Sequence, residues 1–232
     1  SVIIIGKQNK DIYMHIKKKI INKKNKKVFY KKNYIVKKLE KNYFIMNYNN
    51  KLLKFKNPNL LGQHQIENAS TAIAAIFNIK NLGYSIKKNL INKGLINTKW
   101  AGRLEKGYLY KIPVYIDGAH NIAGSKQLVN FFKNKELNRW LIIGMLNNKE
   151  LENYLLQIKN IISGVVAIKI PDEENTFTPD EIMKICKKIN ITCFKKRNIK
   201  KANNFLSNKI KPEQIIISGS LYLVGKVRKL YV

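Results

Sequence analysis

The sequence predicts an α/β protein whose C-terminal part is a Rossmann-like, mostly parallel sheet flanked by helices. From residue 103 onward, apolar runs rich in Ile and Val alternate with amphipathic stretches of about ten residues, the pattern of repeated βαβ units. The first 97 residues instead carry short apolar runs close together and one Ala-rich helical stretch. We therefore expect two units, 1–97 and 103–232, joined by a linker at 98–102.

The first unit opens with an apolar strand at 2–5 and a Lys-rich segment at 11–25, in which Ile12, Ile16 and Ile20 recur at helical spacing. Short strand-like runs follow, and several of them alternate apolar residues with Lys or Asn, as half-exposed antiparallel strands do. Their expected bounds are 28–30, 34–38, 43–47 and 52–55.

Two helices close the first unit. Residues 66–79 are rich in Ala, which favours a helix and permits close packing. A second helix is expected at 85–91, with Ser85 as its N-cap.

The second unit is expected to alternate strands with helices. The strands are predicted at 107–116 (a single strand or a bent pair), 140–143, 165–170, 191–194 and 214–217. The helices are predicted at 121–132, 151–158, 179–188, 198–206 and 221–229. Thr178 followed by Pro179 is a favourable start for the third of these helices.

Charge is the most unusual property of the composition, because the formal net charge is +31. Dense basic residues raise the possibility of nucleic-acid binding. Only four of the 45 basic residues are arginines, however, and the lysines are spread along the whole chain. This distribution favours a solvated basic surface over a nucleic-acid groove, which stays the alternative.

The apolar runs are too short to cross a membrane, and no secretory signal is visible. We therefore expect a cytoplasmic protein with neither a membrane nor a nucleic acid as partner. Cys186 and Cys193 form no metal-ligand pattern, so we interpret them as buried free thiols and expect no metal site among these residues.

Residues 100–121 hold the most informative motif. Arg103 precedes the apolar run 112–116, Asp117 ends it, and His120 comes just before a predicted helix. Ligands of open parallel sheets bind outside the carboxyl ends of the strands, where Asp117 and His120 are expected. Asp117 could bind ribose hydroxyls and Arg103 a phosphate, but a structural Asp-Gly turn and a structural histidine explain the same residues.

Two further motifs bracket this one. His64 and Asn68 share one face at the start of the Ala-rich helix, as a ligand site or as a capping cluster. The segment 219–226 resembles a phosphate loop, but the spacing of its glycines is wrong and Val227 follows its lysine. We interpret it as a strand-to-helix turn with Ser220 at the helix N-terminus.

Taken together, the motifs resemble folylpolyglutamate synthase and dihydrofolate synthase, members of the Mur ligase superfamily. Four stretches in family order carry the resemblance and cover about residues 60–232. They are Gly-Gln-His-Gln with Asn-Ala at 62–69, Asn-Thr-Lys-Trp-Ala-Gly-Arg-Leu-Glu at 97–105, Asp-Gly-Ala-His-Asn at 117–121, and Gly-Ser-Leu-Tyr-Leu-Val-Gly at 219–225.

The resemblance implies an ATP-dependent ligase. A folate or dihydropteroate carboxylate would be phosphorylated by ATP with Mg²⁺, and the amine of L-glutamate would attack the acyl phosphate. By the same resemblance Asn68, Arg103 and Asp117 contact ATP, whereas His120 and Ser220 lie on the glutamate and acyl-phosphate side. Residues 1–97 then correspond to the end of the central ATPase domain, 103–232 to the C-terminal ligase domain, and the protein to a monomer.

The chain also departs from the family pattern. Ala101 and Ile122 stand where proline is usual, and Asn-Lys-Glu at 148–150 occupies the place of Asp-Lys-Asp. The family's phosphate loop and magnesium ligands belong to a region that precedes the part resembled here. We therefore expect this chain to be an incomplete portion, inactive alone, and a non-catalytic remnant or interaction module remains the alternative function.

Overall fold

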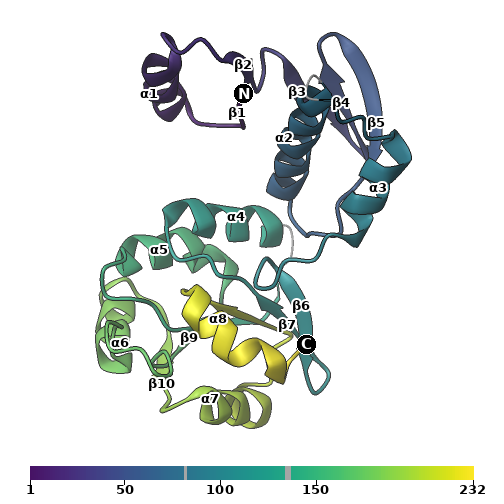
Figure 1. The fold of residues 1–232 in the computed structure, drawn as a ribbon. Helices are drawn as coiled ribbons and strands as arrows, with labels where there is room; N and C mark the ends of the chain where they lie inside the picture. The colour runs from purple at the N-terminus through teal and green to yellow at the C-terminus, as the bar shows by residue number, and fades with distance from the viewer. Residues whose placement is uncertain (81–82, 134–136) are drawn as a thin grey trace. The chain divides into compact units, whose positions relative to one another are not determined.

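The fold was examined in a computed structural model that describes residues 1–80, 83–133 and 137–232. The chain divides into two compact units, Ser1–Lys99 and Trp100–Val232. Each unit has its own buried core. The helices and strands of each unit are labelled in Figure 1.

The first unit contains two small sheets. Strands β1 (Val2–Ile5) and β2 (Lys26–Phe29) pair in parallel across helix α1 (Lys10–Ile20), whose N-cap is Asn9. An antiparallel meander follows, made of β3 (Tyr34–Leu39), β4 (Tyr43–Tyr48) and β5 (Lys51–Lys56). The expected antiparallel pairing therefore holds for the meander, whereas β2 pairs with β1 in parallel.

Helices α2 (Gln63–Ile79) and α3 (Lys88–Asn97) cover these strands. The Ala-rich face of α2 brings Ile73 and Ala74 into a core with Phe44 and Phe55. The prediction for α3 was wrong in its bounds and its cap, because the helix begins after Lys87 and Ser85 lies outside it. The buried pair Ile91 and Leu95, four residues apart, sets where the helix packs.

The second unit is a six-stranded sheet in the order β10-β9-β8-β11-β7-β6. All neighbours are parallel except β6 (Glu105–Leu109) and β7 (Ile112–Ile116), which form a hairpin. The remaining strands are β8 (Arg139–Ile143), β9 (Gly164–Ala167), β10 (Cys193–Lys195) and β11 (Gln214–Ser218). The prediction of a mostly parallel sheet is confirmed. Of the two alternatives for residues 107–116, the pair of strands is correct, because β6 and β7 form a hairpin.

Helices flank both faces of this sheet (Figure 1). One core cluster contains residues of α4 (Ile122–Phe132), α5 (Leu151–Ile158) and α6 (Pro179–Lys188), and the other contains residues of α7 (Ile199–Phe205) and α8 (Leu221–Val227). Thr178 is the N-cap of α6 and Pro179 its first residue, as predicted, and Thr178 also forms a reciprocal capping box with Glu181.

The strand order brings the carboxyl ends of three interior strands together. Strand β11, the last in sequence, lies between β7 and β8 and pairs with both. The segments that follow these three strands therefore emerge side by side at their carboxyl ends. In an open α/β sheet, this is where ligands bind.

Candidate functional site

Asp117 directly follows β7 and is almost fully buried. Its Oδ2 accepts the backbone N–H of Leu104 at 2.8 Å, and its Oδ1 accepts the N–H of Ala119 at 2.8 Å. The carboxylate therefore joins the turn before β6 to the loop after β7. Burial raises the pKa of Asp117, while the two N–H groups and the nearby positive charge of Arg103 oppose that rise.

The turn that carries Arg103 is fixed by a glycine. Gly102 has φ +67°, and a Cβ there would lie 2.6 Å from Val224 Cγ1, so neither the backbone nor the space suits a larger residue. The carbonyl of Gly102 accepts the N–H of Gly118 at 2.9 Å. As a result, half-buried Arg103 lies next to the Asp117 loop, with its Nη1 3.4 Å from where a Cβ of Gly118 would be.

His120 follows in the same loop and is held in one orientation. Its Nδ1 lies 2.8 Å from the carbonyl oxygen of Gly118. Because a carbonyl oxygen can only accept, Nδ1 carries a hydrogen and donates a hydrogen bond to that oxygen. In the neutral ring this leaves Nε2 as an acceptor of a proton or a hydrogen bond. Asn121 then caps α4 by accepting the N–H of Gly124 at 2.8 Å.

The turn after β11 forms the facing wall. Gly219 has φ +111°, and a Cβ there would lie 2.7 Å from the carbonyl oxygen of Gly144. Ser220 is the N-cap of α8, is 2% exposed, and accepts the N–H of Tyr222 at 3.1 Å. The interpretation of this segment as a strand-to-helix turn with Ser220 at the helix N-terminus is thereby confirmed.

A buried chain of hydroxyl groups connects the two walls. The hydroxyl of Tyr154 on α5 donates to Ser218 Oγ at 2.9 Å, and Ser218 donates to the carbonyl of Ala119 at 3.1 Å. The N–H of Gly219 donates to the same carbonyl at 2.9 Å. Both hydroxyl-bearing residues are fully buried, so the loop after β7 and the turn after β11 are fixed to one another without water.

These segments enclose a cavity of about 270 Å³. Its lining residues come from the segments that follow three neighbouring strands: His120 after β7, Leu146 and Lys149 after β8, and residues 219–222 after β11. The structure thus brings His120 and Ser220 to one cavity, with Asp117 and Arg103 in the loop and turn beside it. We call this cavity the strand-tip site.

Lys149 was not predicted as a site residue. In the sequence it stands out only as the middle residue of Asn-Lys-Glu at 148–150. Its membership in the strand-tip site depends on β11 lying between β7 and β8, and chain order does not reveal that arrangement. The available signal was the polar segment 147–150, which follows β8 after three intervening residues.

Asn68 lies in the other unit, near the start of α2. Its side chain is exposed and donates to Gln65 Oε1 at 3.1 Å. Gly62 is the N-cap of α2, and no side chain caps this helix through a hydrogen bond from its N-cap position. His64 lies 3.1 Å from the side-chain amide of Gln65.

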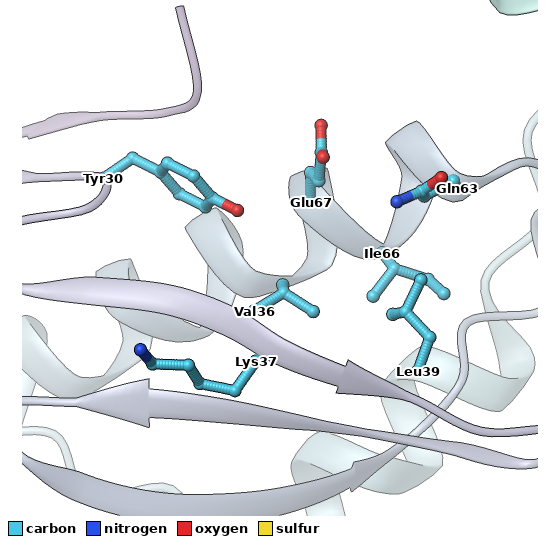
Figure 2. A pocket seen from close by; sticks show the side chains of 7 residues that line it. All are labelled: Tyr30, Val36, Lys37, Leu39, Gln63, Ile66 and Glu67. Carbon is cyan, nitrogen blue, oxygen red and sulfur yellow. The ribbon is translucent and has the colours of Figure 1, made fainter.

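A second cavity, of about 260 Å³, lies in the first unit between β3 and α2 (Figure 2). Val36, Leu39 and Ile66 form its apolar wall, and the Tyr30 hydroxyl points toward the side of the cavity where Glu67 lies. Glu67 also accepts a hydrogen bond from Lys7 at 2.5 Å. Gln63, Ile66 and Glu67 of the 62–69 motif line this cavity, but His64 and Asn68, the two residues that the sequence singled out as candidate ligands, do not.

A family model of the dihydrofolate synthetase C-terminal domain matches residues 103–230. The chain belongs to this family. The match covers all six strands of the sheet in the second unit, and it includes every residue that lines the strand-tip site.

Curated relatives agree with this family membership. The chain is 26% identical over 191 residues to a dihydrofolate synthase/folylpolyglutamate synthase of Bacillus subtilis, covering 73% of this chain and 40% of the relative. It is 24% identical over 193 residues to the dihydrofolate synthetase of Saccharomyces cerevisiae, covering 74% of this chain and 45% of the relative. The chain thus spans less than half the length of these relatives.

Solved structures share the fold. A folylpolyglutamate synthase of Mycobacterium tuberculosis, complexed with ADP and AMPPCP, matches with a TM-score of 0.84 at 17% identity, over 97% of this chain and 54% of that one. Escherichia coli FolC, in complex with DHPP and ADP, matches with a TM-score of 0.78 at 18% identity, over 94% of this chain and 50% of that one.

Within residues 1–80, 83–133 and 137–232, no helix is long and apolar enough to cross a bilayer. No group of three or more His, Cys, Asp or Glu side chains there is placed to hold a metal ion.

Proposed function

We propose that this chain carries part of the active site of an ATP-dependent ligase that joins L-glutamate to a folate or dihydropteroate carboxylate. The observation that supports it best is the strand-tip site: a cation, a histidine with an available Nε2 and a helix-capping serine line one cavity in a domain of the dihydrofolate synthetase family. A carboxylate-bearing amine is a chemical match for that set of groups.

Each lining residue has a proposed task. The Lys149 ammonium attracts a carboxylate of glutamate, and Ser220 offers a hydroxyl at the opposite wall. When the amine nitrogen attacks the acyl carbon, the bond from that carbon to the phosphate oxygen breaks and phosphate leaves. The amine must lose a proton in this step, and His120 Nε2 is the proposed acceptor.

Nucleotide binding is assigned to the neighbouring loops. Arg103 supplies a fixed positive charge beside the strand-tip site, suited to the phosphates of ATP. Asp117 keeps the loop that carries His120 in place, and the second lone pairs of its oxygens remain able to accept ribose hydroxyls. Asn68 is proposed as a further ATP contact from the first unit. The nucleotide complexes of the M. tuberculosis and E. coli structures support the use of ATP by this fold.

Transfer of ¹⁸O from the substrate carboxylate to phosphate tests this proposal. The protein used is the polypeptide purified from its native cells. Dihydropteroate labelled with ¹⁸O in its carboxylate is incubated with ATP, Mg²⁺ and L-glutamate, and the released phosphate is analysed by mass spectrometry. We expect one ¹⁸O atom in each phosphate formed, because the acyl phosphate transfers a carboxylate oxygen. Nucleotide binding without any glutamate-dependent phosphate would instead support the non-catalytic alternative.

A further inference from the structure

Cys186 and Cys193, the two cysteines of the chain, lie together in the second unit and take no part in the strand-tip site. Cys186 is in the last turn of α6 and is fully buried, and Cys193 is the first residue of β10 and is half-buried. The expectation that both are buried free thiols is therefore confirmed for Cys186 and corrected for Cys193, because β10 is an edge strand and leaves its first side chain partly open.

The chain between the two cysteines turns back on itself. The N–H of Ile191 donates to the carbonyl oxygen of Cys186 at 2.9 Å, and the N–H of Ile189 donates to that of Ile185 at 3.2 Å. This return brings the first residue of β10 beside the end of α6. Cys193 packs against the core cluster that contains Cys186, and each thiol influences the pKa of the other.

The two thiols differ in a way that suits stepwise chemistry. The interaction with the Cys186 thiol lowers the pKa of Cys193, while the same interaction and burial raise the pKa of Cys186. The thiolate therefore forms on the sulfur that is more open to solvent. A reactive, accessible thiolate next to a buried partner thiol is the arrangement found at redox-responsive cysteine pairs.

We propose that Cys186 and Cys193 form a thiol-modification site for low-molecular-weight disulfides such as oxidised glutathione. The Cys193 thiolate attacks one sulfur of the oxidised glutathione, which forms a mixed disulfide and releases one glutathione thiolate. Cys186 then loses its proton to solvent and attacks the Cys193 sulfur, which breaks the mixed bond and releases the second glutathione. The pair is oxidised by two electrons, and one oxidised glutathione is reduced to two thiols.

The resulting disulfide would join the end of α6 to the edge of the sheet. Strand β10 has three residues and pairs with β9 alone among the described strands. Besides the contact of Cys193 with the core, an exposed ion pair ties this strand to α6, Lys195 with Asp180 at 2.6 Å. Exposed pairs of this kind stabilise little, so a covalent link would change how firmly β10 is held.

The experiment is an intact-mass measurement on the native, dilute chain after incubation with oxidised glutathione. We expect the mass to fall by about 2 Da, the loss of two hydrogens, and to return after dithiothreitol. Peptide mapping should find both cysteines in one intramolecular disulfide. A stable glutathione adduct on Cys193, a disulfide between two chains, or two unreacted thiols would each overturn the proposal.

Two single variants separate the roles of the sulfurs. In Cys186→Ser the reaction should stop at the mixed disulfide, about 305 Da heavier than the variant alone. In Cys193→Ser the buried Cys186 should stay unmodified under native conditions, and rapid modification there would contradict the assigned order. Should Cys186→Ser fail to fold, the wild-type mass change and its peptide map still decide the proposal.

Discussion

At the scale of single residues, Asp117 is the side chain on which the strand-tip site depends most. Its two oxygens each accept one buried backbone N–H, so asparagine at this position would turn an NH₂ group toward one of those donors. We expect Asp117→Asn to lower the free energy of unfolding by about 1–3 kcal/mol, the cost of a buried donor left without an acceptor. Urea denaturation measures this.

The matched control for this substitution is Asp172→Asn. Asp172 is exposed and pairs with Lys226 at the surface, at 2.7 Å. The same chemical change there should leave stability nearly unaltered. Equal stabilities of the Asp117 variant and the wild type would show that the carboxylate does not hold the loop.

Glu105 makes the stability of the second unit depend on pH. Its carboxylate accepts bonds from the Arg228 guanidinium, at 3.0 Å from Nε and from Nη2 as well, and from the N–H of Gly102 at 3.0 Å. These bonds, chiefly that with Arg228, hold the pKa of Glu105 below the usual range of a glutamate. The stabilisation is therefore complete above the pKa of the unfolded chain and is lost as pH falls through the lower pKa of the folded protein.

The measurement is the melting temperature of the wild type and of Glu105→Gln from about pH 6 to about pH 3. The wild type should be the more stable at the upper end, and the difference should shrink as the solution becomes acidic. Glu174→Gln, a change at an exposed position, serves as the control. A constant difference across the range would mean that the Glu105 charge does not contribute.

At the scale of elements, two glycines of one motif have opposite requirements. A Cβ at Gly219 would lie 2.7 Å from a backbone oxygen at a left-handed φ, whereas Gly225 inside α8 has no atom within 4 Å of its Cβ position. We expect Gly219→Ala to cost about 1–3 kcal/mol in unfolding free energy and Gly225→Ala to add up to about 1 kcal/mol. Thermal unfolding of both variants checks this, and equal effects would contradict the turn geometry.

The hydroxyl chain from α5 gives a second prediction at this scale. Tyr154→Phe should cost about 1 kcal/mol, because Ser218 loses the donor that orients its hydroxyl. It should also shift the NMR signals of His120, because Ser218 donates to the carbonyl of Ala119, the residue before His120. Tyr231→Phe is the matched control, since Tyr231 is also buried and donates to Asn203 at 2.8 Å. The control should lose similar stability with His120 unchanged; shifts of the same size in both variants would refute the connection.

The sequence predicted elements best where local signals and packing agree. The helix at 179–188 has both an N-cap with a following proline and an apolar face, and its bounds were correct. The helix expected at 85–91 relied on one serine, and the buried face of Ile91 and Leu95 moved it toward the C-terminus. The strand expected at 191–194 became β10 at Cys193–Lys195, because it pairs on one side only and its register follows β9.

At the scale of the whole molecule, the sequence identified residues of the site but not their arrangement. Asp117, His120 and Ser220 follow from motifs that end strands or begin helices, and such local positions can be read along a chain. Lys149 required knowledge that β8 and β7 lie on either side of β11, which results from long-range packing. The placement of Asn68 relative to the strand-tip site depends on how two units are arranged, and the sequence does not determine that either.

The most direct test of the account is an NMR titration of the ¹⁵N-labelled chain with L-glutamate in the presence of ADP. We predict saturable shifts of the amides of Ala119, His120, Lys149 and Gly219, with D-glutamate as the control for stereospecific binding. Lys149→Met should abolish the glutamate-dependent shifts and leave the fold intact, since its ammonium is the proposed carboxylate partner. The absence of saturable shifts at these residues, or shifts confined to the cavity between β3 and α2, would contradict the assignment of the strand-tip site.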